Sequence, residues 1–312
     1  TARREEILPA YAEALLGAFR GLARHRVVVD AGNGSMWSLA PDVLRRAGQD
    51  VVPLFCEPNG SFPYRNPNPA IPGHLTALQR MVPEVGADLG IAFDGDGDRV
   101  VFVDERGEVQ PADRVLVLFL RYALAEHPGG AVVYDLKASS VVAEETLAAG
   151  GRPLMERSGH AFIKTRLLDE GAVLGGEVSG HYFFGEIGGD DALYATLYYL
   201  RALDAAGQCP SEALATVPAY PITPDIRLPC PPEEAEAILA ELEGAFHDFP
   251  IDHLDGVRIR FDHGWALARL SVTEPLITLR FEAHTDQELQ HIQERVRDAS
   301  PRLARLLAKA GR

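Results

Sequence analysis

The stretch Ile91-Ala-Phe-Asp-Gly-Asp-Gly-Asp-Arg-Val-Val-Phe-Val103 places an acidic loop between two apolar runs. The runs consist mainly of branched and aromatic residues, which is typical of β-strands. Asp94, Asp96 and Asp98 supply three carboxylates, and the glycines between them allow the backbone angles of a tight loop. Carboxylates this close repel one another unless a cation joins them, and oxygen ligands favour Mg²⁺ or Ca²⁺. The stretch therefore predicts a divalent-cation site between two strands.

Two other interpretations of this loop involve no magnesium. Asp and Gly are common in surface turns, so a plain acidic turn is the simplest alternative. A calcium EF-hand is the second, because Asp94, Asp96, Asp98 and Glu105 fall at loop positions 1, 3, 5 and 12. However, Arg99 occupies the sixth position, where an EF-hand needs glycine, and the flanking runs predict strands rather than helices. An arginine beside the cation also indicates that metal and a bound anion act together, as phosphate chemistry requires.

The whole chain has the composition of an ordinary folded protein and an acidic charge. Its 312 residues are 46% hydrophobic and suggest two domains or three small ones. The net charge of −15 argues against nucleic acids and anionic membrane surfaces as partners. Three widely spaced cysteines form neither a disulfide framework nor a zinc pattern, and no apolar run is long enough for a membrane span. We therefore expect a cytoplasmic protein.

Strands and helices alternate up to the acidic loop and again after it, which predicts α/β domains with largely parallel sheets. Loops that follow parallel strands share one edge of the sheet, where ligands bind. Polar loops follow two later strands, at Asp135-Leu-Lys137 and Gly176-Glu-Val-Ser-Gly-His181. The expected elements are helices at 1–24, 39–47, 73–82, 141–149 and 190–206 and strands at 26–30, 48–55 and 131–134.

The pattern changes after residues 218–232, which contain six prolines and predict a boundary or linker. Beyond it, strands at 256–261, 265–270 and 276–283 lie between helices at 233–246 and from 286 onward, which predicts a small α+β domain. In its loop Arg269-Leu-Ser-Val-Thr273, an arginine and two hydroxyls are compatible with a phosphate clamp. A capped turn between strands is the alternative.

Together these motifs resemble those of the α-D-phosphohexomutases, and most closely the bifunctional phosphomannomutase/phosphoglucomutase group. The resemblance runs from about residue 5 to the C-terminus. It rests on five motifs in family order: Val29-Asp-Ala-Gly-Asn-Gly34, Asp94-Gly-Asp-Gly-Asp-Arg99, Gly159-His-Ala-Phe-Ile-Lys164, Gly176-Glu-Val-Ser-Gly-His181 and Arg269-Leu-Ser-Val-Thr273.

The resemblance implies two consecutive mixed or parallel-sheet α/β domains of the phosphohexomutase type, followed by a small α+β C-terminal domain. Family members move phosphate between C1 and C6 of a hexose through a bisphosphorylated sugar, using a phosphoserine in a first domain. The chain has no Thr-Ala-Ser-His-Asn-Pro loop of the kind that carries this serine. We therefore expect a helix remaining from the first domain (1–24), a metal-binding domain (25–126), a sugar-recognition domain (127–217) and a phosphate-binding domain (218–312).

The family's functional residues carry over to matching positions. The implied Mg²⁺ ligands are Asp94, Asp96 and Asp98, and the implied catalytic residues are Arg99, which neutralises the transferring phosphoryl group, and Lys137 and His160, which are candidates for proton transfer. The implied substrate-binding residues are Glu177 and Ser179 for the sugar and Arg269, Ser271 and Thr273 for the distal phosphate. His181 is expected to orient the sugar loop, and Asp30, Asn33 and the loop 66–69 are expected to be scaffold.

The implied activity is a hexose-phosphate mutase that uses Mg²⁺ and a hexose 1,6-bisphosphate, with glucose or mannose 1- and 6-phosphates as substrates. Without a phosphoserine, the chain by itself is expected to be inactive or weakly active, and its partner would be the donor domain, in cis or in trans. The alternative is a non-catalytic sugar-phosphate-binding protein or partner subunit built on the same scaffold.

Metal preference separates the magnesium site from a calcium-stabilised loop. We expect Mg²⁺ to bind to the acidic loop and sugar phosphate to change its affinity, because metal and anion share the site. Calorimetric titration with MgCl₂ and with CaCl₂, each with and without glucose 1-phosphate, measures both effects. Tighter Ca²⁺ binding without any response to the sugar phosphate would favour the calcium alternative.

Overall fold

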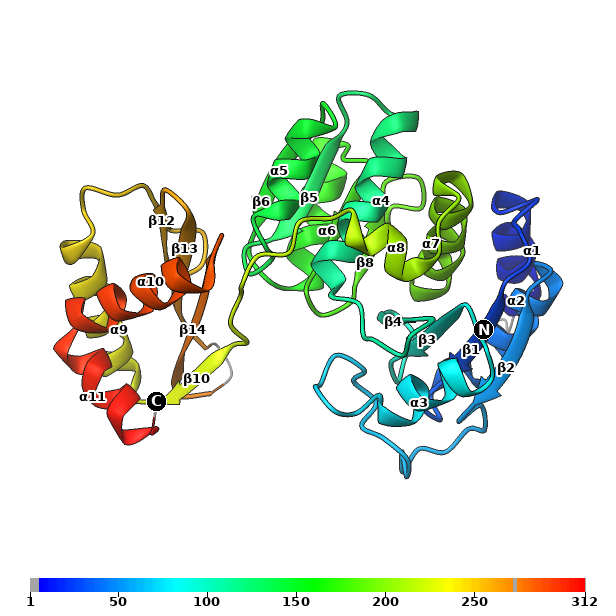
Figure 1. Ribbon diagram of the computed structural model, residues 1–312, viewed down its shortest axis with the longest axis horizontal. Coiled ribbons are helices and arrows are strands. Elements are labelled where there is room, and N and C mark those ends of the chain that lie inside the picture. The colour runs from blue at the N-terminus through cyan, green and yellow to red at the C-terminus, as the bar shows by residue number, and fades with distance from the viewer. Residues whose placement is uncertain (1–5, 272–273, 312) are drawn as a thin grey trace, which may run out of the picture. The chain divides into compact units, whose positions relative to one another are not determined.

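The computed structural model describes residues 6–271 and 274–311, which form three β-sheets with helices packed against them (Figure 1). The chain divides into two compact units. Unit 1 comprises residues 1–138 and 142–218, and unit 2 comprises residues 139–141 and 219–312. The first two sheets belong to unit 1 and the third to unit 2.

The first sheet has the strand order β2-β1-β3-β4. Strand β1 pairs in parallel with β2 and β3, while β4 is antiparallel to β3. Strands β3 and β4 are buried along their whole length, which explains their nearly continuous apolar sequence. The elements are β1 (Arg26–Asp30), β2 (Asp50–Leu54), β3 (Leu89–Phe93), β4 (Val100–Asp104), α1 (Leu8–Ala18), η1 (Ser35–Trp37), α2 (Leu39–Arg46) and α3 (Thr76–Glu84).

The second sheet repeats this arrangement with the order β6-β5-β7-β8-β9. Strand β5 pairs in parallel with β6 and β7, and β8 is antiparallel to β7. Asp191 caps helix α7 by accepting a hydrogen bond from the backbone N–H of Tyr194. The elements are β5 (Ala131–Asp135), β6 (Arg152–Glu156), β7 (Leu174–Gly176), β8 (Tyr182–Phe184), β9 (Gly189–Asp190), α4 (Ala112–Glu126), α5 (Val141–Ala148), α6 (His160–Glu170), α7 (Ala192–Ala206) and α8 (Pro210–Ala215).

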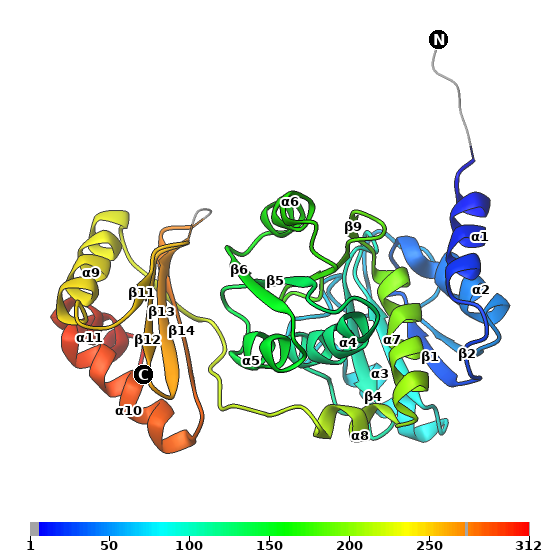
Figure 2. The ribbon, with the colours of Figure 1, turned by 90° about the horizontal axis from the view of Figure 1, so that it is seen from above.

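An aromatic cluster joins the two sheets of unit 1. Phe102 of β4 lies 4.5 Å from Tyr199 of α7, between ring centroids, and Phe119 of α4 lies 4.9 Å from Tyr182 of β8. All four side chains are fully or almost fully buried, and Figure 2 shows α4 and α7 running close together above β4. Aromatic burial of this size is a large apolar contribution, so the two sheets share a core.

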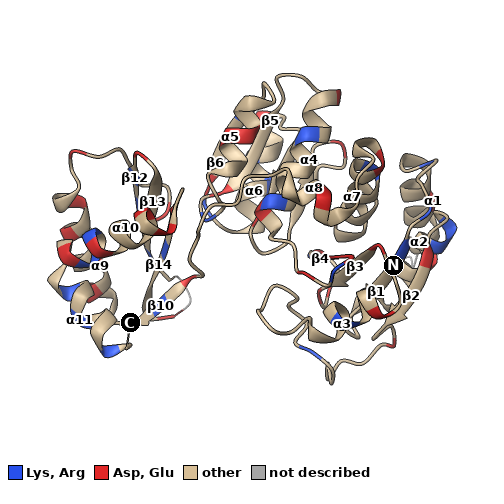
Figure 3. Ribbon diagram, in the orientation of Figure 1, with Lys and Arg blue, Asp and Glu red and all other residues tan. Residues whose placement is uncertain are grey.

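Unit 2 is an antiparallel sheet of order β10-β14-β13-β12-β11, with helices packed on it. Ser300 ends α10 and caps α11 by accepting from the N–H of Leu303, so the helix predicted from residue 286 onward divides into two. Charge is distributed unevenly over these helices (Figure 3): α9 carries only acidic residues, α11 only basic ones, and α10 both. The elements are β10 (Ile226–Pro229), β11 (Ile251–Asp252), β12 (Val257–Phe261), β13 (Gly264–Leu270), β14 (Leu276–Ala283), α9 (Pro232–Ala245), α10 (Asp286–Ala299) and α11 (Pro301–Lys309).

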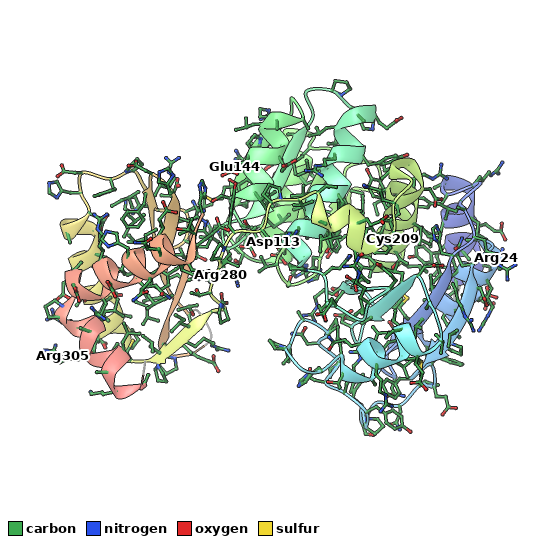
Figure 4. The ribbon with its side chains drawn as sticks, in the orientation of Figure 1. Arg24, Asp113, Glu144, Cys209, Arg280 and Arg305 are labelled. Carbon is green, nitrogen blue, oxygen red and sulfur yellow. The ribbon has the colours of Figure 1, made fainter. Side chains whose placement is uncertain are left out.

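The predicted fold class is confirmed, with corrections in detail. The proline-rich stretch 218–232 contains strand β10, which the sequence did not predict. The strand tolerates Pro229 because β10 lies at the edge of its sheet, where a missing N–H costs least. Near it, Arg280 of β14, which is labelled in Figure 4, is paired with Asp225, 3.2 Å away. No helix in the described part of the chain is long and apolar enough to cross a membrane.

The shared aromatic core predicts where unit 1 is most sensitive to truncation. The substitution Phe119→Ala should lower the free energy of unfolding by about 3–5 kcal/mol, because it leaves a cavity among rings that cannot collapse. Urea unfolding followed by circular dichroism measures this loss. The control Leu147→Ala, at a side chain that is 62% exposed, should change the value by less than about 0.5 kcal/mol. Equal effects of the two substitutions would contradict the shared core.

Candidate functional site

The acidic loop is folded around the side chain of Asp94, which follows strand β3 and is wholly buried. Its Oδ1 accepts hydrogen bonds from the backbone N–H groups of Gly97, Asp98 and Arg99 at 2.9, 3.1 and 3.2 Å. Its Oδ2 accepts one from Nε of Arg99 at 2.7 Å. Gly97 has a φ of +87°, which glycine adopts without strain. The turn that the glycine spacing predicted is therefore built on one carboxylate.

The three carboxylates of this loop fit a hard cation. Asp94, Asp96 and Asp98 each place an oxygen within 4.8 Å of the other two. Oδ1 of Asp98 is buried and has no hydrogen-bond partner among the described residues, although Nε of Arg99 lies 3.6 Å away. A buried carboxylate oxygen without a donor is unfavourable unless a cation approaches it. An all-oxygen set of this kind suits Mg²⁺.

A histidine pair lies next to the loop. His181 and Asp190 each bring a ligand atom within 4.8 Å of an Asp98 oxygen, and Nδ1 of His181 is 2.8 Å from Oδ2 of Asp190. The ring of His160 stacks on that of His181, with centroids 5.7 Å apart. Burial disfavours the imidazolium, but the hydrogen bond with Asp190 and the charges of Asp98 and Glu177 outweigh it. The pKa of His181 therefore lies above its usual range.

The loop predicted to bind the sugar is held against both the acidic loop and the start of α6. The carboxylate of Glu177 is buried; its Oε1 accepts from the N–H of Gly159, and its Oε2 accepts from the hydroxyl of Ser179 at 2.9 Å. The N–H of Val100, just after Arg99, donates to the carbonyl of Gly180 at 3.1 Å. Two loops that are about 80 residues apart in sequence thus meet through the backbone.

Lys137 lies in the turn after β5, which Asp135 organises. Oδ1 of Asp135 accepts from the backbone N–H of Lys137 at 2.9 Å and from the hydroxyl of Ser158 at 2.6 Å. Ser158 precedes Gly159 and His160 directly, so one carboxylate ties the lysine turn to the histidine loop. The structure therefore gathers Lys137, His160 and the Glu177 loop at the same end of the second sheet.

The predicted phosphate clamp belongs to unit 2. A guanidinium nitrogen of Arg269, near the end of β13, is 3.0 Å from Oδ2 of Asp255. The hydroxyl of Ser271 accepts from the N–H of Glu274 at 3.3 Å, which is a capped turn. Thr273 lies outside the described residues. The clamp assignment of these three residues stays a prediction.

Neither the role of Asp190 nor the ion pair of Asp30 was predicted from the sequence, where Asp30 was expected to be scaffold. Asp190 stands beside Asp191 just before α7. Since one aspartate suffices to cap a helix, the second could have been recognised as available for another contact. Arg65, the partner of Asp30 at 2.9 Å, gave no signal, because a lone arginine in a proline-rich loop looks like a solvated charge.

Family comparisons agree with this arrangement. Three family models match consecutive segments, all described as phosphoglucomutase/phosphomannomutase: α/β/α domain II at residues 9–107, α/β/α domain III at 111–220 and the C-terminal domain at 226–299. Fold and motif order thus define a phosphohexomutase scaffold. The chain belongs to the phosphoglucomutase/phosphomannomutase family.

Named relatives place the chain within this family. It is 38% identical over 93% of its length to a phosphomannomutase/phosphoglucomutase of Pseudomonas putida, of which the match covers 63%. The chain therefore spans a little under two thirds of that relative.

Solved structures give the same picture. A phosphoglucomutase/phosphomannomutase family protein of Burkholderia thailandensis has a TM-score of 0.88 at 35% identity, covering 95% of this chain and 64% of that one. An Aspergillus fumigatus N-acetylphosphoglucosamine mutase, solved in complex with GlcNAc-6P and magnesium, has a TM-score of 0.66 at 18% identity, covering 92% and 64%, and shows a shared fold.

The His181–Asp190 pair predicts a titration. In the metal-free protein His181 should titrate above its usual pKa of 6.5, and Asp190→Asn should lower that pKa by removing the anionic acceptor. Mg²⁺ should also lower it by neutralising Asp98. Because the folded pKa is raised, this pair stabilises the fold below pH 6.5, and the contribution is lost as the pH rises through the folded pKa.

Imidazole ¹⁵N shifts followed by NMR across pH measure this titration in the wild type and in Asp190→Asn. Glu170→Gln, at a partly exposed carboxylate at the end of α6 that pairs with Arg152, is the control and should leave the His181 titration curve in place. A curve for His181 that is identical in wild type and Asp190→Asn would contradict the assignment.

Proposed function

We propose that this chain forms the metal- and sugar-binding part of a hexose-phosphate mutase of the phosphomannomutase/phosphoglucomutase type. The reaction interconverts hexose 1-phosphate and hexose 6-phosphate through a hexose 1,6-bisphosphate. One observation carries the proposal: in unit 1 the Val100–Gly180 backbone hydrogen bond joins the acidic loop, in which Oδ1 of Asp98 accepts no hydrogen bond from the described residues, to the Glu177–Ser179 loop. A cation site beside acceptors and donors for sugar hydroxyls is what phosphoryl transfer on a sugar requires.

The acidic loop would hold Mg²⁺ through Asp94, Asp96 and Asp98. The bound cation would supply charge stabilisation for the phosphoryl group in transit. Arg99, fixed by its bond to Asp94, adds a second positive charge at the same place. Because Asp94 already accepts hydrogen bonds from the backbone, its main contribution is to preorganise the loop. Asp98 offers an oxygen that accepts no hydrogen bond from the described residues.

The sugar would lie against the loops at the end of the second sheet. Glu177 can accept from ring hydroxyls and Ser179 can donate to them, and their mutual bond fixes both side chains before substrate arrives. Lys137 and His160 would move the proton at the attacked hydroxyl, positioned through Asp135 and through the stacking on His181. Arg269, Ser271 and Thr273 of unit 2 would hold the phosphate that is not being transferred.

We include magnesium and the bisphosphate because solved structures that share the fold contain them. A. fumigatus N-acetylphosphoglucosamine mutase, which shares the fold, has been solved with GlcNAc-6P and magnesium, and a variant of it with glucose 1,6-bisphosphate. In the family the phosphate donor is a serine of a first domain. We propose that such a domain acts with this chain, in cis or in trans, on glucose or mannose phosphates.

Binding of glucose 1-phosphate tests the sugar site. Glu177→Ala and Arg269→Ala should each raise the dissociation constant roughly 10–100-fold, the cost of a charge-assisted hydrogen bond. Isothermal titration in the presence of Mg²⁺ measures the change. The matched control Arg260→Ala removes an exposed arginine from the neighbouring strand β12 and should leave binding intact. Unchanged affinity in both site variants would overturn the assignment.

A coupled mutase assay then decides between enzyme and binding protein. The chain is given glucose 1-phosphate, Mg²⁺ and glucose 1,6-bisphosphate, with and without a separately made donor domain of a relative. Turnover that needs the donor domain and is lost in Asp96→Ala would support the mutase. Sugar-phosphate binding without turnover under either condition would favour a binding protein instead.

A further inference from the structure

A buried ion pair lies directly beneath the acidic loop. Arg65 and Asp30 have side chains only 2% and 1% exposed, and Nε of Arg65 is 2.9 Å from Oδ2 of Asp30. Asp30 ends strand β1, whereas Arg65 comes from the long loop between β2 and α3. We propose that Arg65 is a positioning residue that, with Asp30, holds the acidic loop in its cation-binding shape. This inference rests on the proposed function of that loop.

The guanidinium of Arg65 contacts the base of the acidic loop itself. One terminal nitrogen donates to the backbone carbonyl of Phe93, the last residue of β3, and the other donates to the carbonyl of Asn66 at 3.0 Å. The Phe93 carbonyl and the N–H of Asp94 belong to one planar peptide unit. That N–H donates in turn to the carbonyl of Arg99 at 3.1 Å, which closes the loop. Arg65 therefore fixes the peptide plane from which the loop departs.

Gly32 makes room for this contact. A Cβ at Gly32 would lie 2.5 Å from Cζ of Arg65, closer than van der Waals contact allows, and the residue has a φ of +52°. Its N–H donates to Oδ1 of Asp30 at 2.7 Å. The carboxylate of Asp30 is thus shared between the turn after β1 and the guanidinium. One ion pair ties the end of β1 to the end of β3.

Strained backbone surrounds the same loop. The three described non-glycine residues with left-handed φ are Asn33 (+62°), Phe55 (+50°) and Phe62 (+48°). The N–H of Asn33 donates to the carbonyl of Phe55 at 2.9 Å. The ring of Phe62 packs on Gly95 of the acidic loop: a Cβ placed on Gly95 would lie 3.6 Å from Cζ of Phe62. Unfavourable backbone persists only where surrounding contacts enforce it, and it concentrates at functional sites.

Stability alone does not account for a buried ion pair. Desolvation of two charges offsets most of their attraction, and an apolar pair of similar volume often serves a fold equally well. An apolar pair would not provide a rigid fork of N–H donors. The guanidinium of Arg65 provides one and donates to the Asp30 carboxylate and to the carbonyls of Phe93 and Asn66. The ion pair is therefore best explained by the orientation that it imposes on the acidic loop.

The double variant Asp30→Asn/Arg65→Met separates positioning from stability. Both charges disappear together, asparagine keeps an acceptor for the N–H of Gly32, and methionine fills much of the arginine volume, so the fold is expected to remain. The carbonyl of Phe93 loses its donor. We expect the dissociation constant for Mg²⁺, titrated calorimetrically with MgCl₂ alone, to rise about 10–100-fold, as on removal of residues that orient metal ligands. The thermal unfolding midpoint should stay near that of the wild type.

The matched control is Arg114→Met. The guanidinium of Arg114 also donates to two backbone carbonyls of unit 1, those of Leu214 and Val217 at 2.7 and 2.8 Å, but away from the acidic loop. The Mg²⁺ affinity of the Arg114→Met variant should equal that of the wild type. In NMR spectra the amide signals of Gly95 and Gly97 should shift in the double variant and not in the control.

The outcomes distinguish this inference from the proposed function. A wild-type chain that binds no Mg²⁺ would refute the proposed metal site itself. Wild-type Mg²⁺ affinity in a folded double variant would overturn the positioning role while leaving the metal site standing. If the double variant does not fold, Arg65→Lys decides, because it keeps the buried charge pair but lacks the fork. Weakened Mg²⁺ binding in that variant would support the inference, and unchanged binding would overturn it.

Discussion

Mutual repulsion among the carboxylates of Asp94, Asp96 and Asp98 is the main cost that the surrounding structure must offset. The protein holds oxygens of all three within 4.8 Å of one another. One of the three carboxylates is held by hydrogen bonds, because Asp94 accepts from three backbone N–H groups and from the side chain of Arg99. Hydrogen-bond donors disperse the charge of that carboxylate and leave Asp98 with an oxygen suited to a cation.

The surrounding fold supplies what the loop needs to keep this shape. Strands β3 and β4 on either side are fully buried, so the loop is anchored at both ends by core side chains. The aromatic cluster around Phe102 and Phe119 joins the first sheet to the second, which brings Val100 to Gly180. Without that shared core, the acidic loop and the Glu177–Ser179 loop would not meet. Aromatic packing away from the candidate site thus determines which loops come together in it.

Much of the architecture could be predicted from local sequence. Strand β3, the acidic turn and the helix after Gly34 follow from apolar runs, from Asp-Gly chemistry and from helical periodicity. Strand β10 could not be predicted, because its four residues lie among prolines and acquire strand geometry only by pairing with β14. The break at Ser300 was also missed, although a serine followed by proline is a recognisable start of a new helix.

The order of five short motifs in the sequence is sufficient to identify the family, and the spacing of the aspartates predicts a tight acidic loop suited to a cation. These signals are local, so residue type and spacing suffice. The pairing of Asp190 with His181 and the contact of Arg65 with the base of the acidic loop become visible only in the folded chain. Both depend on contacts between elements distant in sequence, where the burial of a charge, rather than its type, determines what the residue does.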